Sequence, residues 1–138
     1  MSNALIMVKT LLPGEYQWME ITVQGDVTKQ EDCIIVEYPE SELTGMDKTM
    51  TKMVMKNDGI SIIREGDFNS ELHFKPMDST MGLYQTPYGT LSIMTDTTEY
   101  TLQERDGEYF LVLAYGLTIE GEYQGETAIE MLVQHKVQ

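Results

Sequence analysis

Apolar and polar residues alternate most regularly within residues 49–66, in two runs that flank Asn57, Asp58 and Gly59. A period of two places successive side chains on opposite faces of a β-strand. An Asp-Gly step between two such runs is a strong hairpin signal, because the tight turn needs positive φ and glycine adopts it at no steric cost. We therefore predict strands over residues 49–56 and 60–66, joined by a tight turn.

The rest of the chain contains short alternating or apolar runs and almost no segment with the spacing of an amphipathic helix. We predict further strands over residues 5–12, 16–23, 33–38, 71–75, 90–96, 98–104, 109–119 and 127–137. Residues 25–32 and 40–48 are polar and are expected as connections. Residues 84–89 are expected as a bend, because Pro87 fixes φ and Gly89 is flexible.

Short strands at regular spacing, joined by turn residues, are typical of an antiparallel sandwich or barrel. Asp106-Gly107 repeats the hairpin signal, and Gly121 and Gly125 mark the last turn. A meander of about eight to ten strands is enough to close into a small barrel around side chains or one small ligand. We therefore predict a single all-β domain over residues 1–138, an antiparallel barrel whose last strand pairs with its first and removes the exposed edges.

Arg64 is the unusual residue of this pattern, since it follows Ile60 and Ile62 on the same face of its strand. A guanidinium inside a barrel can bind a carboxylate or phosphate through its planar fork of donors. It can equally be a structural group paired with one of the many carboxylates, because an unpaired buried charge is too costly. A third interpretation is that the strand ends first and the side chain reaches solvent.

Several segments together resemble the YwiB-like family of bacterial proteins of unknown function, in order and spacing, from about residue 5 to residue 133. These segments are Tyr38-Pro39-Glu40-Ser41-Glu42-Leu43-Thr44-Gly45-Met46, the Thr-rich start of the next strand, Arg64-Glu65-Gly66 and Tyr84-Gln85-Thr86-Pro87-Tyr88-Gly89. The resemblance implies a calycin-like β-barrel, the architecture that lipocalins and fatty-acid-binding proteins share. The family brings no established activity, so the resemblance supports the fold and leaves the function open.

Other side chains offer weaker candidates for a site. An apolar wall with hydroxyl groups would result if the tyrosines lined a pocket, although aromatic residues at strand period are more often core or cross-strand pairs. The tyrosines concerned are Tyr84, Tyr88, Tyr100, Tyr109 and Tyr115. Glu40 and Glu42, which flank Ser41, have the chemistry for acid–base catalysis, but carboxylates in a polar loop are usually solvated.

Composition excludes some classes of function. The net charge of −14 and the pI near 4.3 argue against binding to nucleic acid or to anionic membrane surfaces, which need a basic footprint. A lone cysteine, Cys33, excludes an internal disulfide, and His73 and His135 have no spacing that suggests a metal or haem site. No apolar run approaches the length of a membrane span and no secretion signal is recognisable, so we expect a cytoplasmic protein without cofactor or metal.

Residues 109–119 are apolar on both faces of the predicted strand. One stripe includes Tyr109 and Leu111, and Phe110, Val112 and Ala114 lie on the reverse face. One face fills the barrel, and the other must be covered by a neighbouring segment or by another chain. We therefore hypothesise a homodimer.

These observations favour a non-enzymatic barrel that binds a small, partly apolar, anionic ligand in its interior. The expected binding residues are Arg64, Tyr84, Tyr88, Tyr100, Tyr115 and Glu40, and no catalytic residue is predicted. One alternative is an enzyme acting on a small anionic substrate in the same cavity, with Tyr88 or Glu40 as acid–base partner. Another is a protein-interaction barrel with a filled core.

Overall fold

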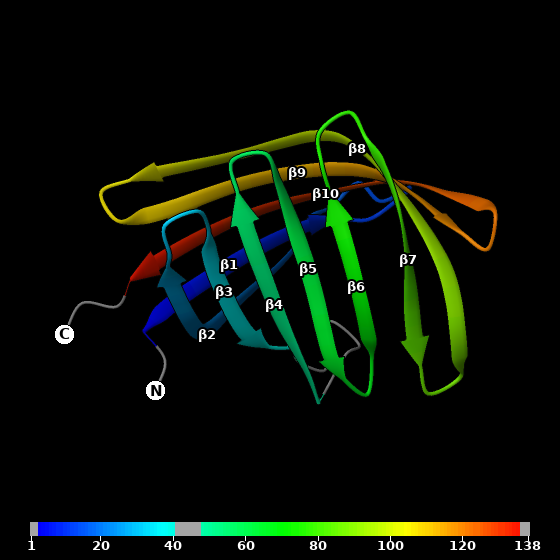
Figure 1. Cartoon of the computed structure of the whole chain (residues 1–138), viewed down its shortest axis with the longest axis horizontal. Helices are drawn as coiled ribbons and strands as arrows, with labels where there is room; N and C mark the ends of the chain where they lie inside the picture. Colours follow the sequence, from blue (N-terminus) through cyan, green and yellow to red (C-terminus); the bar gives the residue numbers. More distant parts are fainter. Residues whose placement is uncertain (1–2, 41–47, 136–138) are drawn as a thin grey trace.

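Ten antiparallel strands form a closed barrel in the computed structural model, which describes residues 3–40 and 48–135 (Figure 1). The strands are β1 (Ala4–Leu11), β2 (Met19–Lys29), β3 (Ile34–Pro39), β4 (Thr49–Lys56), β5 (Gly59–Gly66), β6 (Asn69–Phe74), β7 (Ser79–Thr86), β8 (Gly89–Arg105), β9 (Glu108–Ile119) and β10 (Glu122–His135). Each strand pairs with its neighbours in sequence, and β1 pairs with β10. The predicted all-β barrel with meander connections is confirmed.

The closing pair runs along the whole of β1. Its register extends from Ala4 opposite His135 to Leu11 opposite Ala128, and the described ends of the chain lie side by side (Figure 1). The pairing satisfies the outer hydrogen-bonding groups of the first and last strands, as the prediction of a closed sheet requires.

The hairpin of β4 and β5 is confirmed, but its turn differs from the expected one. Lys56 pairs with Gly59, which leaves Asn57 and Asp58 as a two-residue loop, and no residue of this turn has positive φ. Glycine is required at position 59 because β6 packs too closely for a side chain: a Cβ there would lie 2.6 Å from the backbone oxygen of Phe74 on β6. A turn with positive φ at both central residues does occur between β8 and β9, at Asp106 and Gly107 (φ 53° and 78°).

The expected connection at residues 25–32 is mostly strand. β2 continues to Lys29 and pairs with β3, with Val27 buried and its polar neighbours exposed. Gly25 allows this pairing, because a Cβ there would lie 2.3 Å from the backbone oxygen of Glu37. Of the expected connection at residues 40–48, residues 41–47 lie outside the described part of the chain.

The expected bend at residues 84–89 is the end of β7, and only Pro87 and Tyr88 form the turn into β8. In β7 the inward positions include Thr80 and Gly82, and the outward positions include Met81 and Leu83, which are exposed. These two apolar residues of the strand therefore face outward, opposite to the usual pattern. The two strands expected at residues 90–104 are one strand, β8, interrupted by a bulge between Thr97 and Glu99.

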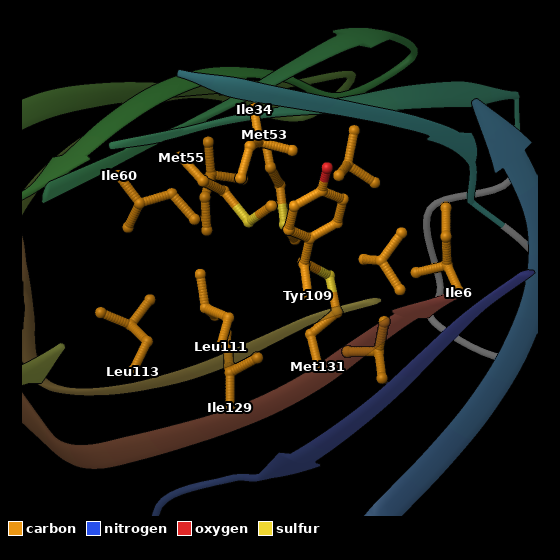
Figure 2. Close-up of a cluster of buried hydrophobic side chains, with 14 of the residues drawn as sticks. Ile6, Ile34, Met53, Met55, Ile60, Tyr109, Leu111, Leu113, Ile129 and Met131 are labelled. Carbon is orange, nitrogen blue, oxygen red and sulfur yellow. The ribbon is translucent and has the colours of Figure 1, made fainter. Parts of the chain in front are cut away.

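The apolar core fills one part of the barrel interior. Figure 2 shows side chains from β9 and β10, among them Leu111 and Met131, pointing toward Met53 and Met55 on β4. These four side chains are buried, and their contacts supply the hydrophobic stabilisation of the fold. The ring of Phe74 lies 4.6 Å from that of Tyr115 and borders the more polar part of the interior.

The reverse face of β9 lies on the outside of the barrel. Phe110 is 39% exposed, and Val112 and Ala114 are partly buried, so the homodimer stays a prediction. Across residues 3–40 and 48–135, no helix of the length and hydrophobicity needed to cross a membrane is present. The cytoplasmic location likewise stays a prediction.

Candidate functional site

A row of polar side chains crosses five neighbouring strands on the inside of the barrel. The register pairs Tyr38 with Thr51, Thr51 with Arg64, Arg64 with Ser70 and Ser70 with Tyr84. Tyr38, Thr51 and Ser70 are buried, and the other two side chains are partly buried. Residues that are register partners point to the same side of a sheet, so this row forms a polar band in an interior that is otherwise largely apolar.

Arg64 and Glu40 form the charged centre of the band. Arg64 Nε lies 3.9 Å from Glu40 Oε2, and the side chains are 17% and 2% exposed. Thr51 Oγ1 donates a hydrogen bond of 2.7 Å to the same carboxylate oxygen. At 3.9 Å the ion pair is too long to be a hydrogen bond, and the buried Nε has no hydrogen-bond partner.

This geometry excludes one of the three interpretations of Arg64. The side chain faces the barrel interior, so the interpretation that it reaches solvent is wrong. It is paired with a carboxylate, as the structural interpretation requires, yet one donor remains unused. An unused buried donor is what a ligand-binding guanidinium offers, because a guanidinium has five N–H groups to satisfy.

The band opens into a cavity of about 270 Å³. Its walls come from β1, the β1–β2 connection, β2, β3, β4, β5, β9 and β10. They consist of Val8, Thr10, Leu12, Pro13, Met19, Ile21, Tyr38, Glu40, Met53, Arg64, Tyr115, Leu117, Thr127 and Ile129. Aliphatic side chains dominate this lining. A largely apolar wall with a few polar groups is typical of a small-molecule site.

Two tyrosine hydroxyls of the lining remain protonated at neutral pH. Burial, and after it the Glu40 carboxylate, raises the pKa of Tyr38 well above its ordinary value, although Arg64 acts in the opposite direction. Burial also raises the pKa of Tyr115, against the effects of Arg64 and of a hydrogen bond with Thr127. Both side chains are therefore neutral hydrogen-bonding groups and add no charge to the cavity.

The structure brings four of the six expected binding residues to this region. Arg64, Glu40 and Tyr115 line the cavity. Tyr84 belongs to the polar band, and burial raises its pKa while nearby Arg64 lowers it. Ser41 and Glu42, considered with Glu40 for acid–base chemistry, lie outside the described residues.

Tyr88 and Tyr100 do not lie at the cavity, so this part of the expected pocket lining is wrong. Tyr88 is 95% exposed, because it occupies the turn between β7 and β8 and not a strand. Tyr100 is buried, and its hydroxyl donates to the backbone oxygen of Lys56 at the β4–β5 turn. It therefore fixes the position of the hairpin in the apolar part of the barrel.

Sequence reasoning missed Tyr38 and the residues of the β1–β2 connection. Tyr38 lies two positions before Glu40, near the end of β3, and both are buried, so extending the alternation backward from Glu40 would have found it. Leu12 and Pro13 reach the cavity only because the sheet closes, and no local pattern indicates this. The fit is tight, since a Cβ at Gly125 of β10 would lie 2.8 Å from the Pro13 side chain.

A second polar cluster lies on the outer wall, between β5 and β6. Ser61 Oγ lies 2.7 Å from His73 Nδ1, and His73 Nε2 lies 3.2 Å from Glu71 Oε1. The side chains of His73 and Glu71 are 49% and 62% exposed, so water competes for both contacts and each contributes little. Within the described part of the chain, no group of three or more metal-ligating side chains is present.

Comparison with known proteins supports the fold and the family. The crystal structure of the ywiB protein from Bacillus subtilis superposes with a TM-score of 0.84 over 99% of this chain and 93% of that chain, at 15% sequence identity. No curated protein matches the chain in sequence. The family described as a domain of unknown function, DUF1934, matches residues 7–131. The resemblance to the YwiB-like family is thereby confirmed, and the chain belongs to the DUF1934 family.

Proposed function

We propose that this protein binds a small, partly apolar molecule with an anionic head group inside the barrel, without a covalent step. One observation carries the proposal: the buried Nε of Arg64 has no hydrogen-bond partner and belongs to a side chain that lines a largely apolar cavity. A buried donor without a partner costs about 1–3 kcal/mol. A ligand oxygen that reaches the guanidinium of Arg64 from the cavity gains a charge-assisted hydrogen bond.

The size of the cavity limits the ligand. A volume of about 270 Å³ lies just below the range of about 300–1,000 Å³ that is usual for small-molecule sites and suits a ligand of about ten to fourteen non-hydrogen atoms. Octanoate has this size, a carboxylate for Arg64 and a flexible chain for the aliphatic walls. With about 0.4–0.7 kcal/mol from each atom, we expect a Kd between about 10 µM and 1 mM.

Binding is better supported than catalysis. Of the two acid–base partners expected for an enzyme, Tyr88 lies on the surface and only Glu40 is at the cavity. The raised pKa of Tyr38 and of Tyr115 makes their hydroxyls poor bases at neutral pH. The alternative of an interaction barrel with a filled core requires an interior without such a cavity.

Isothermal titration calorimetry with octanoate and with neutral 1-octanol tests the proposal. We expect octanoate to bind the wild-type protein more tightly than 1-octanol. The double variant Arg64→Met/Glu40→Gln removes both charges together and should lose this preference. The control is Arg105→Met, which changes the other, exposed arginine at the end of β8. Equal affinity of the wild-type protein for both probes, or no binding of octanoate, would contradict the proposal.

A further inference from the structure

We infer that Glu40 makes the cavity selective for singly charged anions, so that a monoanionic head group binds beside Arg64 and a dianion such as a phosphate monoester is rejected. This inference rests on the proposed function and specifies its ligand class. Among the described lining residues, Arg64 and Glu40 are the only charged side chains.

Glu40 is held beside the site of the head group. Its carboxylate is 2% exposed and accepts the Thr51 hydroxyl at 2.7 Å. Its backbone N–H donates to the backbone oxygen of Thr49 at 2.8 Å, which anchors the residue next to the end of β3. A carboxylate that is held in this way cannot rotate out into solvent when an anion enters the cavity.

The distance between Glu40 and a bound anion follows from the ion pair. Glu40 Oε2 lies 3.9 Å from Arg64 Nε. The terminal nitrogens of a guanidinium lie about 2.3 Å from Nε, and an oxygen that accepts a hydrogen bond from one of them lies about 2.9 Å further. The two negative groups are therefore at most about 9 Å apart, and bulk water screens charges poorly at a buried site. Each unit of negative charge on the ligand is repelled by Glu40.

The balance of charge then favours one negative charge over two. Arg64 and Glu40 together are neutral, so a monoanion leaves the site with one net negative charge and a dianion leaves it with two. The hydroxyls of Tyr38 and Tyr115 are neutral, so they can bind a head group by hydrogen bonds but compensate none of its charge. The net charge of −14 on the whole chain acts in the same direction.

Four probes with the same eight-carbon chain separate charge from shape. Octanoate is a planar monoanion, octyl sulfate a tetrahedral monoanion, octyl phosphate a tetrahedral dianion at pH 8, and 1-octanol is neutral. In calorimetric titrations at that pH, we expect the wild-type protein to bind octyl phosphate at least about tenfold more weakly than octyl sulfate. Octanoate and octyl sulfate should differ by less than about fivefold.

Glu40→Gln tests the cause of this difference. Glutamine keeps the shape of the side chain and an oxygen for the Thr51 hydroxyl, but it removes the charge. The difference between octyl sulfate and octyl phosphate should shrink to less than about threefold. The matched control is Glu37→Gln, on the outward face of β3, the strand that precedes Glu40, which should leave the difference unchanged.

The possible failures are distinguishable. If octanoate and octyl sulfate bind neither the wild-type protein nor Glu40→Gln, the proposed function and the inference both fall. If the wild-type protein binds octyl sulfate and octyl phosphate equally, or if Glu40→Gln leaves their ratio unchanged, only the inference falls. If Glu40→Gln does not fold, octyl methyl phosphate replaces the variant as the test of charge selectivity in the wild-type protein. This diester has the tetrahedral shape of octyl phosphate but only one negative charge, so it must bind more tightly than octyl phosphate.

Discussion

Arg64 and Ser70 are direct register partners on β5 and β6, and each has a buried polar atom without a hydrogen-bond partner, Nε of Arg64 and Oγ of Ser70. Both belong to the polar band that borders the cavity. Buried polar groups are almost always hydrogen-bonded in folded proteins. Of the three such atoms among the described residues, the third being Thr97 Oγ1 on β8, two therefore lie on neighbouring strands of this band and lower the stability of the fold there.

Removing the Ser70 hydroxyl should consequently cost nothing. We expect Ser70→Ala to leave the free energy of unfolding unchanged or to raise it by up to about 1 kcal/mol, because the variant no longer buries an unsatisfied group. Urea unfolding of the unliganded protein measures this effect. The matched control is Thr51→Val, which deletes a hydroxyl of the same band that does donate to Glu40 and should cost about 1.5–3 kcal/mol. Equal losses for both variants would contradict the prediction.

Removing the Arg64 charge alone should be severe. Arg64→Met leaves the buried Glu40 carboxylate without its cation, and breaking a buried ion pair in this way costs about 3–5 kcal/mol. The double variant Arg64→Met/Glu40→Gln removes both charges and should recover to within about 1.5 kcal/mol of the wild-type protein. A double-mutant cycle from urea unfolding gives the coupling of the pair, and additive losses would show that the two charges do not interact.

High pH should weaken the fold through its buried tyrosines. Burial raises the pKa of Tyr38 and Tyr115 above the value of about 10 that tyrosine has in an unfolded chain. The folded state therefore favours the protonated hydroxyl. This stabilisation is complete below about pH 10 and is lost as the pH rises from there through the folded-state pKa.

Urea unfolding at several pH values between about 9 and 11.5 checks this expectation, because the free energy of unfolding should fall progressively above about pH 10. Tyr38→Phe removes one titrating hydroxyl and should make the fall less steep. A free energy of unfolding that stays constant over this range in the wild-type protein would disprove the argument.

Glycine is needed at the β4–β5 and β8–β9 turns for different physical reasons, and substitution by alanine should destabilise the two turns to different extents. A Cβ at Gly59 would lie 2.6 Å from a backbone oxygen of β6, whereas Gly107 has positive φ and open space around it. We expect Gly59→Ala to cost about 3 kcal/mol through the backbone clash and Gly107→Ala about 1 kcal/mol through backbone strain. Thermal unfolding with calorimetry compares the two, and an equal or reversed order would contradict the assignment.

The barrel and the face of the strand on which Arg64 lies could be predicted from sequence because both depend on period-two alternation, whereas the solvent interpretation of Arg64 had to be left open. Where inward positions are small or polar, this signal disappears, and β7, with Thr80 and Gly82 facing inward, was missed for that reason. Tyr88 was misplaced although Pro87 and Gly89 predicted a bend there, because a residue's place in a bend does not show whether its side chain points into the barrel or into solvent. Closure alone brings Leu12 to the cavity beside Arg64, so no local pattern could have paired them.

The β1–β10 pair also constrains how the chain reaches its native state. Each of the other pairings joins strands that are consecutive in sequence, so these ladders can grow hairpin by hairpin at a small entropic cost. Ala4 and His135, which are register partners, must instead find each other across almost the full length of the polypeptide. We therefore expect the formation of this seam to be the late step in folding, and until it forms the curved sheet has two free edges that can recruit another molecule.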